Sequence, residues 1–185
     1  MTYDTFEQAI LNLPSLKNSP NDQVTIKEIL KLIFNDSHWL TNSNKICKIR
    51  IDTYARFIRN YGAFNNDLPR RLIALFSTQW FYGPLSANSC ATLCKEGFVV
   101  RYSSSDDGSY TVHFKDSSKY LIQRLVTNNN PQNFTCVYKA YGNTYNSLQD
   151  AITSNLNSLG APFSEFESYT DFCKNPGKYQ TLGYK

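Results

Sequence analysis

Residues 97–114 read GFVVRYSSSDDGSYTVHF, and this stretch determines the fold that the sequence predicts. Three apolar residues precede Arg101, and apolar and polar side chains alternate from 110 to 114, which is typical of two β-strands. The polar run 103–108 between them ends in glycine and predicts a turn. Alternation places Arg101 and Val99 on the same face of the first strand. We therefore expect an antiparallel sheet to begin here.

The pattern continues on both sides of this stretch. Residues 120–126 predict a third strand and residues 134–138 a fourth. Ser86 is placed to cap a helix before the sheet, and Ser147 to cap a second helix that ends at Gly160. We expect an α+β fold in which a central antiparallel sheet is flanked by two helices, because this is one of the few stable layer arrangements.

Residues 1–79 have a different pattern, with apolar residues at three- and four-residue steps. They predict four short amphipathic helices, which begin at Asp4 or Thr5, at Thr25 with Glu28 in capping-box spacing, near Ile46, and near Pro69. We find no motif for chemistry among them. The sequence thus predicts a small all-α helical subdomain, residues 1–79, followed by the α+β domain, residues 80–185.

The composition excludes several classes of protein. With 185 residues, of which 41% are hydrophobic and 18% charged, the chain can bury a core and is too apolar for a disordered protein. It lacks both a run of about eighteen apolar residues and a basic segment followed by an apolar one at its start. The five cysteines are irregularly spaced without a C-x-x-C pair, so neither a disulfide framework nor a metal site is expected. We expect a reduced, cytoplasmic protein without a cofactor or a membrane partner.

Arg101 is the residue most informative about chemistry. A charged side chain that points inward from a central strand is costly to bury unless an anion meets it. A guanidinium presents paired donors that match the oxygens of a phosphate. The serines that follow, Ser103, Ser104 and Ser105, add hydroxyls and backbone N–H groups that can form an anion nest. The same spacing also fits an exposed arginine beside a solvated loop, and the residues alone leave both interpretations open.

Five segments, in sequence order, resemble the Src homology 2 (SH2) domain family. They are WFYGPLS at 80–86, GFVVRYSSS at 97–105, YTVHF at 110–114, KYLI at 119–122 and YNSLQ at 145–149. They match the family's W-[FY]-x-G-x-[IL]-S opening, its F-L-V-R-x-S strand and loop, its Y-x-[LV]-x-[FV] and H-Y-x-I strands, and the start of its second helix. The resemblance covers roughly residues 80–157, and its specificity comes from five ordered segments rather than from one short match.

The resemblance implies a signalling adaptor domain that binds phosphotyrosine-containing peptides or proteins without catalysis. Arg101 falls at the family's phosphate-binding arginine, and the three serines fall on its phosphate-binding loop. Lys119 falls where the family usually has histidine, Leu121 beside the tyrosine ring, and Tyr120 where the peptide continues after the phosphotyrosine. The implied site residues are Arg101, Ser103, Ser104, Ser105, Thr111, His113, Lys119, Tyr120 and Leu121.

One departure from the family pattern leaves an alternative open. Many members carry a second arginine in the first helix, at the place where this chain has Ala87. Lys119 is the residue expected to supply that charge. The alternative is a scaffolding or interaction module that keeps the fold, while its pocket is degenerate or binds another phosphorylated ligand.

Enzymatic activity is not expected from the residues. Six residues separate Cys94 from Arg101, whereas the phosphatase loop with a cysteine and an arginine needs five, and those between them are strand-like. The two histidines, His38 and His113, lie in unrelated segments and offer no local acid–base pair.

The remaining expectations concern partners and location. A net charge of +4 without a basic stripe does not indicate a nucleic-acid partner, and we expect a monomer. The abundance of Asn and Ser and the solitary architecture also resemble SH2-containing effectors that intracellular bacteria inject into host cells. For such an effector the site of action is the host cytosol.

Overall fold

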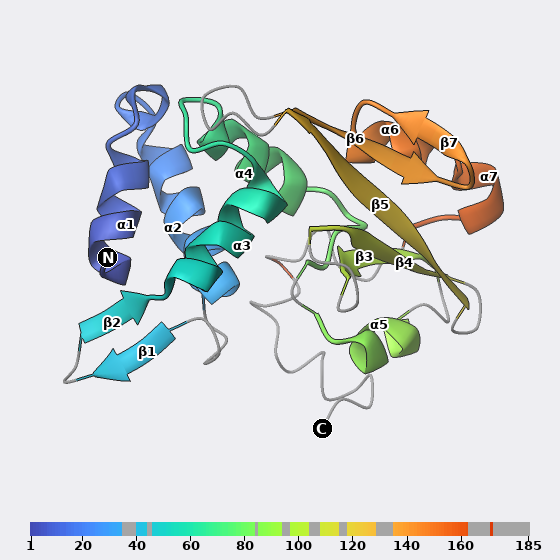
Figure 1. The fold of residues 1–185 in the computed structure, drawn as a ribbon, viewed down its shortest axis with the longest axis horizontal. Helices are drawn as coiled ribbons and strands as arrows, with labels where there is room; N and C mark the ends of the chain where they lie inside the picture. The colour runs from blue at the N-terminus through green and yellow to red at the C-terminus, as the bar shows by residue number, and fades with distance from the viewer. Residues whose placement is uncertain are drawn as a thin grey trace. The chain divides into compact units, whose positions relative to one another are not determined.

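The computed structural model describes residues 1–34, 40–43, 46–83, 85–93, 97–103, 108–114, 118–128, 135–162 and 171. The chain divides into two compact units, Met1–Leu75 and Phe76–Lys185, which are described separately below (Figure 1). The boundary predicted from the sequence was between residues 79 and 80. No helix in the described ranges is long and apolar enough to cross a membrane.

The first unit combines helices with a short hairpin. Its elements are α1 (Tyr3–Leu11), the 3₁₀ turn η1 (Pro14–Leu16), α2 (Pro20–Phe34), β1 (Leu40–Ser43), β2 (Ile46–Ile49), α3 (Ile51–Tyr61) and α4 (Leu68–Phe76). The prediction of an all-α subdomain is therefore wrong for Leu40–Ser43 and Ile46–Ile49, which are strands. Strands β1 and β2 pair antiparallel, and the Ile49 N–H also donates to the Met1 carbonyl at 3.0 Å. Pairing with distant backbone outweighs the local helical spacing of Ile46 and Ile49.

Two of the predicted helix starts are also corrected. Helix α1 is capped by Thr2, whose Oγ1 accepts a hydrogen bond from the Thr5 N–H at 3.1 Å. Helix α2 begins at Pro20, so Thr25 lies inside it and bonds back to the Asn21 carbonyl at 3.0 Å. The helices pack around buried aromatic rings, among them Phe6 and Phe57 with centroids 5.1 Å apart. This packing supplies most of the stability of such short helices.

The second unit is an α+β domain built on a five-stranded antiparallel sheet, as predicted in outline. Its elements are α5 (Ala87–Leu93), β3 (Val99–Tyr102), β4 (Tyr110–Phe114), β5 (Ser118–Asn128), β6 (Thr135–Ala140), β7 (Asn143–Tyr145), α6 (Leu148–Thr153) and α7 (Leu156–Leu159). The strands follow one another in the order β3-β4-β5-β6-β7 (Figure 1). Strand β7 was not predicted.

The helix caps of this unit follow the sequence closely. The Ser86 Oγ accepts from the Ser89 N–H at 3.1 Å, and the Ser147 Oγ accepts from the Asp150 N–H at 3.0 Å. The single helix predicted after Ser147 is instead two short helices. They are separated at Asn155, whose side-chain amide donates to the Ala151 carbonyl at 2.7 Å and so occupies a helical acceptor.

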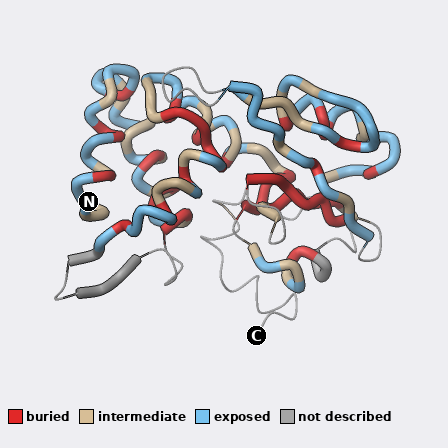
Figure 2. Tube along the Cα trace, in the orientation of Figure 1, coloured by how far each residue is buried: buried red, intermediate tan, exposed pale blue. Residues whose placement is uncertain are grey.

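Strand β3 is an interior strand, because backbone pairs with it on both sides. Besides its ladder with β4, the Val100 N–H donates to the Trp80 carbonyl at 2.7 Å, and the Tyr102 N–H donates to the Gly83 carbonyl at 2.9 Å. A Cβ on Gly83 would lie 3.0 Å from ring carbons of Phe81 and of Tyr102, so a larger residue here would require these rings to shift. Buried residues concentrate on β3 and β4, whereas most of β5 is exposed (Figure 2).

Candidate functional site

The strand register gathers polar side chains on one face of the sheet. Arg101 lies opposite Thr111, Thr111 opposite Leu121, and His113 opposite Lys119. Because directly opposed residues in an antiparallel pair share a face, these five residues form one patch across β3, β4 and β5. The resemblance assigned Arg101, Thr111 and His113 to one site, and the register places all three on one face of the sheet. We call this patch the arginine face.

Arg101 is buried within its unit and is held by neutral groups. Only 6% of it is exposed. Its Nε donates to His113 Nε2 at 2.9 Å, and its Nη1 donates to the Tyr102 carbonyl at 2.6 Å. Within the described ranges, no carboxylate forms an ion pair with Arg101. A buried guanidinium without a counter-charge is expensive, and an anionic ligand is the simplest group to offset that cost.

His113 acts as the acceptor for this arginine and is uncharged. It is 3% exposed, and burial, together with the positive charges of Arg101 and Lys119, lowers the pKa of His113 from its usual 6.5 to about 4. Since Nε2 accepts a hydrogen bond, the proton must reside on Nδ1. The positive charge of the arginine face therefore comes from Arg101 and Lys119, not from the imidazole.

The base of the serine loop is fixed at both ends. The Ser103 N–H donates to the Ser109 carbonyl at 2.8 Å, and Gly108 has a φ of 89°, which favours glycine. The Ser109 hydroxyl in turn accepts from the Arg124 N–H at 2.9 Å. Ser103 thus lies two residues from Arg101 at the end of β3. Ser104 and Ser105 lie outside the described residues.

The structure separates Tyr120 from the rest of the predicted site. It pairs with Val112, so it projects from the face of the sheet opposite to Arg101. Its ring centroid lies 4.4 Å from that of Tyr141 and 5.8 Å from that of Phe114. Lys119 and Leu121 flank it in sequence on the arginine face, and both are exposed.

The same opposite face carries a second arginine that sequence reasoning missed. Arg124 Nε donates to the Cys136 Sγ at 3.1 Å, and Arg124 lies opposite Tyr138 in the β5–β6 ladder. Burial raises the pKa of the neighbouring Tyr110, which is 2% exposed and stays a neutral phenol. The alternation of β5 could have indicated this position, because Arg124 is two residues from buried Ile122. Arg124 binds groups of its own unit, and it does not belong to the arginine face.

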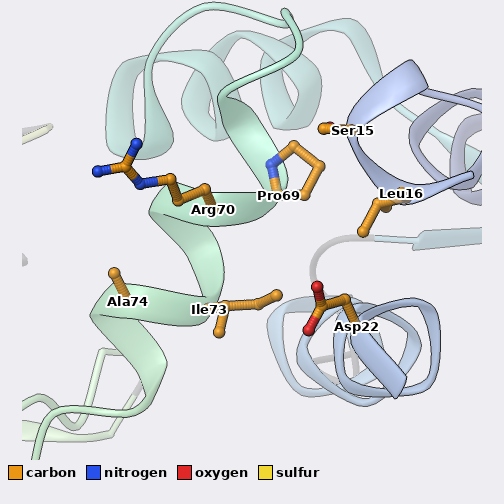
Figure 3. A pocket seen from close by; sticks show the side chains of 7 residues that line it. All are labelled: Ser15, Leu16, Asp22, Pro69, Arg70, Ile73 and Ala74. Carbon is orange, nitrogen blue, oxygen red and sulfur yellow. The ribbon is translucent and has the colours of Figure 1, made fainter. Parts of the chain in front are cut away.

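A separate pocket of about 280 Å³ lies in the first unit, between η1 and α2 on one side and α4 on the other (Figure 3). The Asp22 carboxylate points into it beside Ile73, whereas the Arg70 guanidinium points away. Its other lining groups are mainly apolar, including Leu16 and Pro69. Within the described part of the chain, no group of three or more His, Cys, Asp or Glu could hold a metal ion. The pocket offers one acidic group, whereas the arginine face offers several polar groups.

The arrangement on the arginine face fits an anion. It combines the buried guanidinium, the Lys119 ammonium and the Thr111 hydroxyl, which are kinds of group that bind phosphate in proteins. No protein-family model matches the chain, and no curated protein matches it significantly.

Proposed function

We propose that the second unit binds phosphotyrosine-containing peptides or proteins through the arginine face and acts as a non-catalytic adaptor. The observation that carries the proposal is Arg101, which is buried on an interior strand with no carboxylate partner among the described residues. A phosphotyrosine carries about −1.5 to −2 charges near neutral pH and supplies the missing counter-charge.

Two further lines support phosphotyrosine over other anions. The first is the resemblance of the five sequence segments to the SH2 family. The second is the exposed Leu121, 40% of whose surface is accessible, next to Lys119 on the arginine face. A phosphorylated tyrosine needs an apolar contact for its ring near a cationic contact for its phosphate, and phosphoserine is too short to use both.

Each residue then has a distinct proposed role. Arg101 binds the phosphate through its remaining donors, and the serine loop adds hydroxyls and N–H groups. Lys119 supplies the second charge, because the first helix has Ala87 where the family often has arginine. Leu121 packs on the ring, and Tyr120, on the opposite face, contacts the peptide after the phosphotyrosine.

The alternative function is a scaffolding module whose pocket is degenerate or takes another phosphorylated ligand. A specific observation favours it. Arg101 already donates to His113 and to the Tyr102 carbonyl, and Ala87 provides no second donor. Such a pocket has fewer donors for phosphate than a two-arginine pocket.

A direct binding comparison separates the two functions. Isothermal titration calorimetry with peptides of one sequence, carrying phosphotyrosine, phosphoserine or unmodified tyrosine, is expected to show heat only for phosphotyrosine. Equal binding of phosphoserine, or no binding of any phosphopeptide, contradicts the proposal and favours the alternative.

Lowering the pH below about 6 should weaken binding, because the phosphate then loses its second charge. We place this activity in a cytosol with tyrosine kinases, the host cytosol if the chain is an injected bacterial effector.

A further inference from the structure

We propose that His113 is a positioning residue, a neutral acceptor that fixes the Arg101 guanidinium while leaving its full charge for a doubly negative ligand. This inference rests on the proposed function and adds a requirement to it. The requirement is that the group opposite Nε must accept a hydrogen bond without carrying a negative charge.

The first step is geometric. His113 lies opposite Val99, two residues along β3 from Arg101, and such diagonal positions are within reach of long side chains. The contact from Arg101 Nε to His113 Nε2 holds one edge of the guanidinium, and the Tyr102 carbonyl holds Nη1. A guanidinium has five N–H donors in a fixed plane. Two contacts on that plane fix its orientation and leave three donors without a partner among the described residues.

The second step concerns charge. Both acceptors are uncharged, since one is a carbonyl and the other is an imidazole held neutral by its surroundings. The cations that face His113 are Arg101 on β3 and Lys119 on β5, and they and burial lower the pKa of His113 to about 4. A carboxylate at this position could orient the arginine equally well, but it would also neutralise it. A neutral histidine can orient the Arg101 guanidinium without cancelling its positive charge.

The third step excludes the nearest competitor for this role. Thr111 lies directly opposite Arg101, yet the side chain to which Arg101 donates a hydrogen bond is that of His113. His113 Nδ1 is buried and has no hydrogen-bond partner in the described part of the chain. An unsatisfied buried N–H destabilises a protein by about 1–3 kcal/mol. Stability alone therefore does not explain a histidine here, whereas positioning of Arg101 does.

The first test needs no ligand. In the ¹⁵N-labelled chain, the Arg101 Nε–H signal is assigned by its loss in Arg101→Lys, and its exchange with water is measured in the wild type and in two variants, His113→Gln and His113→Leu. Glutamine can place an acceptor where His113 Nε2 lies, and leucine cannot. We expect slow exchange in the wild type and in His113→Gln, and exchange faster by at least about tenfold in His113→Leu. Equal protection in His113→Leu overturns the inference.

The second test measures binding of the phosphotyrosine peptide and adds His113→Glu. This variant keeps an acceptor beside Arg101 but makes it negative. We expect His113→Gln to bind within about threefold of the wild type, and His113→Glu to retain the protected Nε–H but lose at least about tenfold in affinity. Circular dichroism checks that each variant is folded. Affinity equal to the wild type in folded His113→Glu overturns the inference.

The two tests keep this inference distinct from the proposed function. If the wild type binds no phosphotyrosine peptide, the proposed function fails. Inorganic phosphate then replaces the peptide as the probe in the same variants. If phosphate binding also shows no loss in His113→Glu, the inference fails as well.

Discussion

Replacing Arg101 with leucine is the sharpest perturbation of the proposed site. Arg101 is 6% exposed and has no ion-pair partner among the described residues, so the bound phosphate would face it in a partly desolvated setting. Truncating one member of a buried charge pair costs about 2–5 kcal/mol of binding, which corresponds to an affinity loss of roughly 30-fold to several thousand-fold. Titration calorimetry with a phosphotyrosine peptide at fixed ionic strength measures this loss.

The same substitution should leave the fold nearly intact, which makes the test interpretable. Leucine leaves His113 Nε2 and the Tyr102 carbonyl without their donor, which destabilises, but it also removes a buried charge, which stabilises. We expect the free energy of unfolding to change by less than about 2 kcal/mol. Arg70→Leu, at an exposed arginine of the first unit, is the matched control for loss of one positive charge. Arg101→Leu with affinity within about threefold of the wild type would refute the reasoning.

Four further predictions concern single side chains. Lys119→Ala should weaken phosphotyrosine binding about three- to tenfold, by loss of a solvent-exposed cation; unchanged affinity in the same titration would remove Lys119 from the site. The pKa of His113 is about 4 in the folded state and 6.5 in the unfolded state, so the unfolded state binds the proton first as the pH falls. Urea unfolding should therefore show the free energy of unfolding decreasing between pH 6.5 and 4, by at most about 3 kcal/mol. This decrease should be absent in His113→Gln. Ser147→Ala should lower the free energy of unfolding by about 1 kcal/mol, because the cap of α6 is lost, and an unchanged melting temperature would contradict this. Gly83→Ala should destabilise by about 1–3 kcal/mol, because its Cβ meets the Phe81 and Tyr102 rings; thermal melting as in the wild type would show that the rings move aside.

The parts of the fold that the sequence predicted are those set by local rules. The strands around Arg101 and the caps at Ser86 and Ser147 follow from alternation and capping, and the structure confirms them. The hairpin at 40–49 was missed because its strands depend on pairing rather than on spacing. Strand β7 was missed because three residues are too few to show alternation.

The sequence could predict which residues belong to the candidate site, but not which hydrogen bonds join them. The resemblance assigned Arg101 and His113 to one site, yet no pattern in the sequence indicates that they bond to each other. That contact depends on the register between β3 and β4, which pairs Val99 with His113. A shift of one residue would have moved His113 to the other face. The charge state of His113 could not be predicted from the sequence either, because burial and two neighbouring cations determine its pKa.

The register also explains why the opposite assignment, in which Arg124 is the ligand-binding arginine, is less consistent with the structure. Both arginines lie on strands of one sheet, Arg101 on β3 and Arg124 on β5, with β4 between them. Arg124 donates to Cys136 and has Tyr138 as its cross-strand neighbour, on the face of the sheet opposite to the arginine face. Arg101 donates instead to His113 on β4 and to the Tyr102 carbonyl at the end of β3, near the backbone hydrogen bond from Ser103 to Ser109. Among the described residues, Arg101 is thus held in place without an ion-pair partner, which is consistent with the proposed anion site.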